Sequence, residues 1–180
     1  MKLTTLLIIS LGVFLVGCAS NKEEANAPLT ATAKVIGSNN ESYGDAYFEE
    51  QDNGVKVTLN LSGFPAEAKG LHGMHIHETG KCEGPDFGTA GGHFNPTFKE
   101  HGKDNPNGHH LGDLPNLEIA EDGTAKMTVM AEGVTLKKDA EYSLLDGEGT
   151  AIVIHESADD YMTDPTGESG GRIACGVIQS

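Results

Sequence analysis

The segment KVTLNL, residues 56–61, alternates polar and apolar side chains, and AKMTVM at residues 125–130 does the same. Because successive side chains of a β-strand point to opposite faces, this alternation predicts two strands, each with one buried face. Turn residues precede both segments, as Asp52-Asn53-Gly54 and Glu121-Asp122-Gly123. These turns predict hairpins, so we expect an antiparallel fold.

Five more short runs are expected to form strands, at residues 31–36, 43–49, 117–120, 151–155 and 172–178. Beyond the start of the chain, no stretch shows the apolar period of an amphipathic helix. Short strands with glycine-rich turns are typical of an all-β domain, and the pattern leaves a sandwich and a barrel equally open. Two long polar segments, 78–113 and 156–171, do not fit the strand pattern, and such loops usually carry function.

The chain starts with MKLTTLLIISLGVFLVGCAS. Its apolar run, residues 3–16, is shorter than the about 20 residues of a membrane-spanning helix and suits a secretory signal. The run ends in Leu15-Val16-Gly17-Cys18, which resembles a bacterial lipobox. We therefore expect residues 1–17 to be a signal peptide and Cys18 to be lipidated, with palmitate among its acyl chains; an ordinary signal peptide with an incidental cysteine is the alternative. Residues 18–28 are polar and predict a tether, so the folded domain is expected to span 29–180.

The composition is acidic, with 12 Lys and Arg against 27 Asp and Glu and a formal net charge of −15. Removal of the predicted signal takes away Lys2, which leaves 11 basic residues against 27 acids, or −16. A charge of this sign and size argues against nucleic acid as a partner.

Two cysteines remain beyond the signal, Cys82 and Cys175. Outside the cytoplasm an isolated pair in one domain is expected to form a disulfide. Neither residue belongs to a C-x-x-C pair, so a cysteine-based zinc site is not expected.

Residues 91–113 read GGHFNPTFKEHGKDNPNGHHLGD and hold four of the chain's eight histidines. The segment has too few apolar side chains for a hydrophobic core to order it. A metal ion could do so, because the free energy of metal binding is coupled to folding. The loop offers three imidazoles and one carboxylate, a set that zinc accepts: His93, His101, His110 and Asp113.

Further histidines come from the predicted strands. In His75-Ile76-His77 the two imidazoles are two residues apart, so on a strand both point to the same face. His155 ends the apolar strand predicted at 151–155. Imidazole-rich sites also suit copper, which exceeds zinc in divalent affinity.

Five segments together resemble the copper/zinc superoxide dismutases, of the bacterial lipoprotein type. They are HIHE at 75–78, GHFNP at 92–96, HLGD at 110–113, HESADD at 155–160 and GRIACGVI at 171–178. They follow one another in the family's order, and the resemblance runs from about Leu29 to the C-terminus. It implies an eight-stranded Greek-key β-barrel or sandwich with long metal-binding and electrostatic loops.

The resemblance also implies a site with two metals. Copper would be held by His75, His77, His93 and His155, and zinc by His93, His101, His110 and Asp113, with His93 bridging the two. Asp159 would hydrogen-bond one ligand imidazole of each metal, His75 and His101, and so fix the orientation of both rings. Cys82 and Cys175 match the family's disulfide.

The implied function is dismutation of superoxide to dioxygen and hydrogen peroxide, in the bacterial cell envelope and outside the cytoplasm, with the protein lipid-anchored to a membrane. The resemblance assigns catalytic roles to His93, as a proton donor, and to Arg172, whose guanidinium would attract the substrate anion. The loop between His155 and Gly171 carries five acids and no lysine. Steering is then left to Lys99 and Lys103, so we expect a rate below the diffusional limit that salt slows only mildly.

Two other functions fit parts of the pattern. One is a metal-binding lipoprotein of the same fold without dismutase activity, which stores, delivers or buffers copper. The other is a surface adhesin or structural module, which leaves the ligand pattern unexplained. Whether the protein is a monomer or a homodimer is left open by the sequence.

Some residues near the predicted ligands are expected to have ordinary roles. His72 and His109 are out of register with the family pattern and are predicted to be solvated surface histidines. Met74 and Phe94 are predicted to pack in the core.

Overall fold

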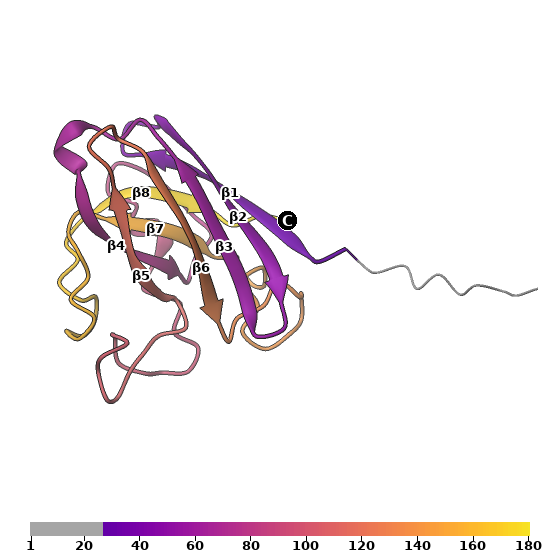
Figure 1. Ribbon diagram of the computed structural model, residues 1–180. Helices are drawn as coiled ribbons and strands as arrows, with labels where there is room; N and C mark the ends of the chain where they lie inside the picture. The colour runs from indigo at the N-terminus through magenta and orange to yellow at the C-terminus, as the bar shows by residue number, and fades with distance from the viewer. Residues whose placement is uncertain (1–26) are drawn as a thin grey trace, which may run out of the picture.

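The computed structural model describes residues 27–180, which form one antiparallel sheet of eight strands. The strands are β1 (Thr30–Gly37), β2 (Ser42–Gln51), β3 (Gly54–Leu61), β4 (Gly70–His77), β5 (Asp113–Ile119), β6 (Ala125–Glu132), β7 (Ala151–His155) and β8 (Arg172–Val177). Their order in the sheet is β5-β4-β7-β8-β1-β2-β3-β6. The two end strands, β5 and β6, also lie against each other, so the sheet curls into a nearly closed barrel (Figure 1).

The connections make this barrel a Greek key rather than a simple meander. Asp52 and Asn53 form the predicted turn between β2 and β3, and the ladder runs without a shift from Gln51↔Gly54 to Gly44↔Leu61. Strands that are not consecutive in the chain are neighbours at three places, where β3 pairs with β6, β4 with β7 and β1 with β8. The all-β prediction is confirmed, and the choice that the pattern left open falls on the barrel.

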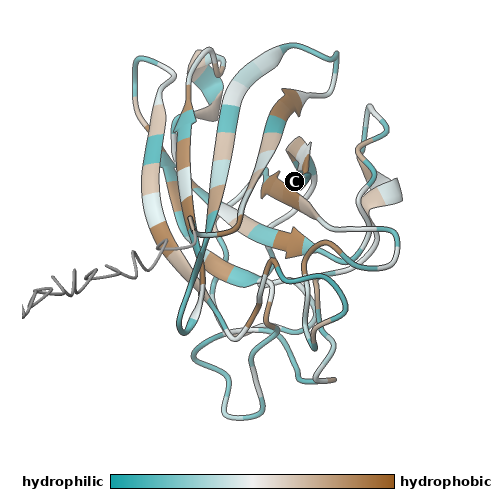
Figure 2. Cartoon of the chain, turned by 90° about the vertical axis from the view of Figure 1, so that its right-hand side faces the viewer, coloured by the Kyte–Doolittle hydropathy of each residue, from teal (hydrophilic) through white to brown (hydrophobic). Residues whose placement is uncertain are grey.

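The predicted alternation of β3 is present in the structure. Val57, Leu59 and Leu61 point into the barrel and are almost fully buried, while the residues between them are more exposed. Figure 2 shows the resulting bands of hydrophilic and hydrophobic residues along the long strands. Burial of such a side chain contributes about 1.5–3 kcal/mol, so these inward rows supply much of the stability of the fold.

Strands β4 and β7 are buried on both faces over most of their length. All five residues of β7 are buried, and so are the last six of β4. The loop between β4 and β5, residues 78–112, covers the outer face of β7, where Phe87 and Ala90 pack against Ala151 and Val153. The outer face of β4 and β7 is thus shielded from solvent, and this loop and the loop 156–171 lie over it (Figure 1).

Two strands begin at least four residues earlier than the sequence predicted. Strand β5 starts at Asp113 instead of residue 117, and β4 extends back from the His75–His77 segment to Gly70. The glycines of β4 and Pro115 of β5 conceal the strand pattern. Within residues 27–180 the helices are two short 3₁₀ turns, Ala66–Ala68 and Gly88–Ala90. In that same range, no helix has the length and apolar character needed to cross a bilayer.

The predicted signal peptide and Cys18 lie outside the described residues. The predicted tether lies there as well, except for its last two residues.

Candidate metal centre

The site is built on the outer face of β4 and β7. Met74 and Ile76 point into the barrel core, so His75 and His77 point outward. Across the ladder His75 pairs with Val153, and His155 lies two residues farther along β7, on the same outer face. Three of the predicted ligands are therefore placed by strand geometry alone.

Both ends of the histidine-rich part of the loop 78–112 are fastened to Ile76. The Phe94 N–H donates to Ile76 O at 2.8 Å, and the Ile76 N–H donates to Gly112 O at 2.8 Å. The Gly112 N–H in turn donates to Phe94 O at 2.9 Å. A side chain at position 112 would lie 2.3 Å from Ile76 O, so only glycine permits this approach. These three hydrogen bonds place His93 and Asp113 beside the strand histidines.

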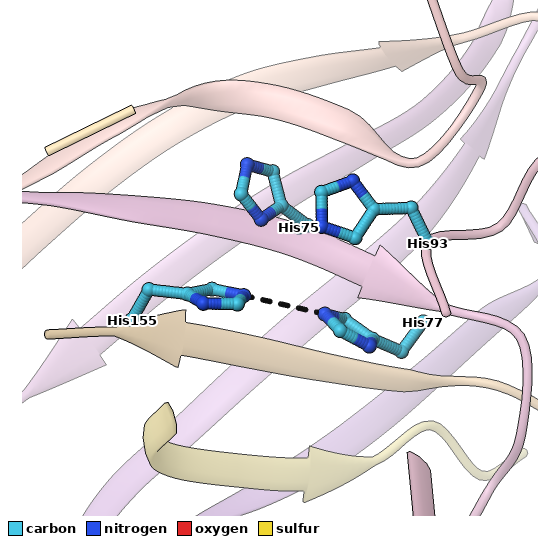
Figure 3. Close-up of side chains that lie close together, drawn as sticks. All are labelled: His75, His77, His93 and His155. Carbon is cyan, nitrogen blue, oxygen red and sulfur yellow. Dashed lines mark hydrogen bonds between the residues drawn. The ribbon is translucent and has the colours of Figure 1, made fainter. Parts of the chain in front are cut away.

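Four imidazoles converge in a first ligand set, made of His75, His77, His93 and His155 (Figure 3). Each offers a ring nitrogen, and these four atoms lie within 4.8 Å of one another. All four residues are buried. The structure thus brings together the residues predicted to hold copper.

The tautomers of two of these histidines follow from their partners. His77 Nδ1 lies 3.0 Å from Gly91 O and His155 Nδ1 lies 3.3 Å from Gly170 O, so both Nδ1 atoms must carry the proton. The two Nε2 atoms then present lone pairs to each other at 3.3 Å (dashed in Figure 3). Two lone pairs at this distance repel, and a cation bound between them removes the repulsion.

Asp159 fixes two further rings in the same manner. His75 Nε2 donates to Asp159 Oδ2 at 2.9 Å, and His101 Nε2 donates to Asp159 Oδ1 at 3.0 Å. The opposite nitrogens, Nδ1 of His75 and of His101, are buried without a hydrogen-bond partner, as is Nε2 of His93. Buried polar atoms without partners are rare in folded proteins, and here each one points into a ligand set. These orphaned nitrogens show that the residues present fit bound metal ions.

The second ligand set surrounds Asp113. Its Oδ1 lies 2.9 Å from His93 Nδ1 and 3.1 Å from His110 Nδ1, and its Oδ2 lies 3.0 Å from His101 Nδ1. The last contact does not have hydrogen-bond geometry, which is why His101 Nδ1 counts as unpartnered. His75 also comes close to this set: one ligand atom each of His75, His93, His101 and Asp113 lie within 4.8 Å of one another. We favour His110 over His75 here, because His75 Nε2 already donates to Asp159 and its free nitrogen belongs to the first set.

Burial keeps three imidazoles of the first set, those of His77, His93 and His155, unprotonated. It lowers the pKa of His77 to about 2, of His155 to about 3 and of His93 to about 4, with nearby positive groups acting in the same direction. For His93 the carboxylate of Asp113 partly opposes this effect. Neutral rings are the form in which histidine binds metals.

Two buried carboxylates, Asp113 in the second set and Asp159 beside it, act in the opposite direction. Burial by itself would raise the pKa of Asp113, but the close contacts with His101, His110 and His93 outweigh it and hold this pKa far below the ordinary value. Burial likewise disfavours the charged form of His101, but Asp113 and Asp159 together raise its pKa to about 9. This part of the site thus collects negative charge that draws cations, as a metal site with a carboxylate ligand requires.

Comparison with known proteins agrees with this geometry. A family model for copper/zinc superoxide dismutase (SODC) matches residues 42–178. The chain belongs to the copper/zinc superoxide dismutase family.

Relatives support the same assignment. The chain is 46% identical over 151 residues to superoxide dismutase [Cu-Zn] 2 of Aquifex aeolicus, a match that covers 84% of this chain and 87% of that protein. It is 47% identical over 130 residues to the superoxide dismutase-like protein YojM of Bacillus subtilis, covering 72% and 65%. The crystal structure of a SOD-like protein from Bacillus subtilis superposes with a TM-score of 0.76 at 41% identity, covering 81% of this chain and 96% of that one.

Arg172 lies beside the four-histidine set, as the family resemblance implied. Its guanidinium donates to Phe87 O and Gly91 O, each at 2.6 Å. Gly91 O also accepts from His77 Nδ1, so one carbonyl oxygen links the guanidinium to a ligand imidazole. The side chain is half-buried, and burial lowers its pKa, yet a guanidinium remains charged in proteins.

A disulfide helps to hold the carbonyl groups of Phe87 and Gly91 in place. Cys82 and Cys175 are bonded, with their Cα atoms 5.7 Å apart. The bond attaches the first part of the loop 78–112 to β8, the strand that begins with Arg172. Phe87 and Gly91 are thereby kept where their carbonyls reach the guanidinium.

One prediction about the neighbouring histidines was wrong. His72 is not on the surface: it is 5% exposed, with Nδ1 2.8 Å from His155 O and Nε2 2.7 Å from Ala68 O. The half of β4 that carries it was not predicted as a strand, so its inward placement could not be expected. His109 is exposed, Met74 is fully buried and Phe94 packs on the core, all as predicted.

Sequence reasoning also missed two residues that hold Asp159. The side chain of Asn116 bonds its main chain, and Tyr161 donates its own N–H to Asp159 Oδ1 at 2.7 Å. Both contacts involve main-chain atoms, for which no side-chain motif exists.

Proposed function

We propose that this protein is a catalytically active copper/zinc superoxide dismutase. The observation that carries the proposal is the sharing of His93 between two buried ligand sets, with Arg172 fixed at the edge of one of them. In the reaction, one superoxide gives up an electron and leaves as dioxygen, while a second gains an electron and two protons and leaves as hydrogen peroxide.

The residues divide between two metals as the donor atoms suggest. Copper would be held by His75, His77, His93 and His155, and zinc by His93, His101, His110 and Asp113. Copper, when bound, supplies the electron exchange with superoxide, and zinc supplies charge and rigidity.

The protein's side chains attract the substrate, transfer the proton and orient the metal ligands. Arg172 offers a fixed positive charge to a small anion, and its two carbonyl contacts hold the guanidinium in one orientation. His93 presents Nδ1 toward Asp113, and its Nε2 faces the four-histidine set. Nε2 is therefore the atom at which a proton can be held and passed to the reduced product. Asp159 keeps His75 and His101 in the tautomers that expose Nδ1.

A dismutation assay on protein loaded with both metals tests the proposal. We expect His155→Ala to remove nearly all activity, and Arg172→Ala to lower the second-order rate constant by about tenfold through loss of local attraction. His109→Ala, which changes an exposed histidine of the same loop, should leave the rate unchanged. Full metal loading without activity in the unmodified protein, or equal rates in all three variants, would overturn the proposal.

A second function is favoured by one comparison. The Bacillus subtilis relative is named a superoxide dismutase-like protein, so a metal-binding role without dismutation deserves its own test. The same loaded protein would then bind copper tightly and show no rate above that of free buffer. Against this role, all four histidines of the copper set and Arg172 are present in this chain.

We further propose that the protein acts in the cell envelope, attached through a lipid on Cys18. The lipobox-like Leu15-Val16-Gly17-Cys18 supports this. The described chain also begins on the side of the barrel away from the loops 78–112 and 156–171 (Figure 1). An anchor there leaves the metal centre clear of its attachment point.

Labelled palmitate should be incorporated into the unmodified protein. Cys18→Ser should lose the label and leave the membrane fraction. An unmodified protein without label, or a variant that stays in the membrane, would refute the anchor.

A further inference from the structure

Tyr161, in the loop 156–171, forms hydrogen bonds with three separate parts of the chain. Its phenol oxygen accepts from the Asn116 N–H of β5 at 2.8 Å, and its N–H donates to Asp159 Oδ1 at 2.7 Å. Its carbonyl oxygen accepts from the Asp104 N–H in the loop 78–112 at 3.0 Å. No ring nitrogen of the two ligand sets bonds the phenol, so it has no direct part in the chemistry.

The three residues that follow His101 pack closely on Tyr161. Gly102 has φ +101°, and a side chain there would lie 2.3 Å from Tyr161 O, so this contact requires glycine. The Lys103 ammonium lies 3.9 Å from the centre of the Tyr161 ring, within the range of a cation–π interaction. Asp104 completes the contact through its N–H.

These contacts reach the zinc ligands through one carboxylate oxygen. Asp159 Oδ1 accepts from both Tyr161 N and His101 Nε2, and the segment 102–104 is continuous with His101. Asn116 holds the main chain of Asp159 from the other side. The phenol is therefore the group through which Tyr161 bonds directly to the barrel. This bond helps to fix Asp159 and the segment 102–104, which together orient His101.

We propose that Tyr161 is a positioning residue that fastens the zinc-ligand segment 101–104 to β5 and thereby slows the release of zinc. The inference rests on the zinc site of the proposed function. It assigns the retention of one metal, in preference to the other, to a side chain outside both ligand sets. Tyr161 bonds Asp159 Oδ1, the oxygen that holds His101, whereas His75 of the copper set bonds the other oxygen, Oδ2.

Tyr161→Phe tests this role, since it removes one oxygen and keeps the ring. The matched control is Tyr43→Phe, which removes a phenol that donates to Glu41 Oε1 at 2.8 Å, away from both ligand sets. Protein loaded with copper and zinc is mixed with an excess of a chromogenic zinc chelator, well below the unfolding temperature. We expect zinc to leave Tyr161→Phe about tenfold faster than the unmodified protein, the factor that one lost hydrogen bond accounts for.

The visible spectrum of copper and its release to a copper chelator provide the second measurement. Both should be unchanged in Tyr161→Phe, and cobalt(II) placed at the zinc site should give an altered absorption spectrum. A general loss of stability would instead speed the release of both metals, and Tyr43→Phe would then behave alike. That result, or equal zinc release in Tyr161→Phe and the unmodified protein, would overturn the role of Tyr161 while leaving the zinc site itself intact.

A second pair of variants covers the case in which Tyr161→Phe does not fold. Lys103→Met removes the ammonium over the ring, and Lys99→Met changes an exposed lysine of the same loop. We expect zinc release about threefold faster in Lys103→Met, in line with a surface cation–π contact, and no change in Lys99→Met. Equal rates in the two would overturn the proposal, and unmodified protein that binds no zinc would overturn the zinc site as well.

Discussion

The side chain of Asn116 forms two hydrogen bonds with the main chain of Asp159. Its Nδ2 donates to Asp159 O at 2.9 Å, and its Oδ1 accepts from the Asp159 N–H at 2.8 Å. The amide thus takes the place of a neighbouring strand and holds a loop residue against β5. Because Asn116 holds the main chain of Asp159, the carboxylate keeps a fixed position from which it accepts hydrogen bonds from His75 and His101.

Replacement of Asn116 by Ala should therefore loosen the carboxylate and both rings. We expect the free energy of unfolding of the metal-loaded protein to fall by about 2 kcal/mol, near 1 for each lost hydrogen bond, and zinc affinity to fall by about 10–100-fold. Chemical denaturation and competition with a zinc chelator measure the two effects. Asn60→Ala, an exposed asparagine on β3, is the control and should change neither quantity. If both variants retain zinc equally well, Asn116 does not support the metal centre.

The charge at the edge of the site leads to a prediction about substrate approach. Glu156 is exposed, its N–H bonds Gly171 O, and a side chain on Gly171 would meet its carboxylate, so this acid lies next to Arg172. Glu78 is also exposed, and its Oε1 accepts from the Gly92 N–H beside His93. Both carboxylates repel an incoming anion.

We expect the double variant Glu78→Gln with Glu156→Gln to raise the dismutation rate constant by about two- to threefold at low salt, where the Debye length is about 30 Å. The gain should largely disappear at physiological ionic strength, and the unmodified protein should slow only mildly as salt is added. Glu118→Gln, on the exposed side of β5, provides the control for net charge. A rate that stays constant or falls in the double variant would show that the two acids do not hinder the substrate.

Glu50 gives a prediction about acid stability that does not involve the metals. Its Oε1 accepts from the Thr135 hydroxyl and its Oε2 from the Leu136 N–H, both at 2.7 Å. Burial by itself would raise the pKa of Glu50, but these hydrogen bonds, helped by Lys137, outweigh it and lower the pKa. A carboxyl group with a lowered folded-state pKa stabilises the fold above its unfolded-state pKa, and this contribution is lost as the pH falls through the folded-state value.

Glu50→Gln should therefore cost about 1.5–3 kcal/mol of unfolding free energy at neutral pH, as expected for hydrogen bonds to a charged group. The difference from the unmodified protein should shrink once the pH falls below 4.5, the ordinary pKa of a glutamate side chain. Glu49→Gln, the preceding residue on β2, weakens an exposed ion pair with Lys56 and a contact with Gln51, so its cost should be much smaller. Denaturation curves from acid to neutral pH compare the three proteins, and a pH-independent difference would contradict the assignment.

Most of the ligand positions could be predicted because they follow from short-range rules. The two-residue spacing of His75 and His77 fixes a common face on any strand, and the polar loop with its histidines has no reason to be ordered without a metal. The structure brings these residues together as expected. Asp159, too, stood in a recognisable segment.

The supporting residues could not be predicted in the same way. The Asn116 side chain bonds the main chain of Asp159, 43 residues away in the sequence. The Tyr161 phenol bonds the main-chain N–H of Asn116, 45 residues away. An asparagine or tyrosine near a strand or in a loop has many ordinary roles, and only the closed barrel decides which main-chain groups it meets. The same holds for His72, whose position depended on a half-strand that its glycines concealed.

His72 gives the last prediction, because it connects a copper-set histidine to the barrel. Its ring spans from His155 O to Ala68 O, at 2.8 and 2.7 Å, and it is 5% exposed. His72→Ala should remove both contacts and leave a cavity, at a cost of about 2–4 kcal/mol in unfolding free energy. It should also speed copper release to a chelator, since His155 is then held by fewer contacts. His109→Ala should change the unfolding free energy by no more than about 0.5 kcal/mol, because that side chain is exposed. Equal copper retention in both variants would mean that the main chain of β7 holds His155 without help from His72.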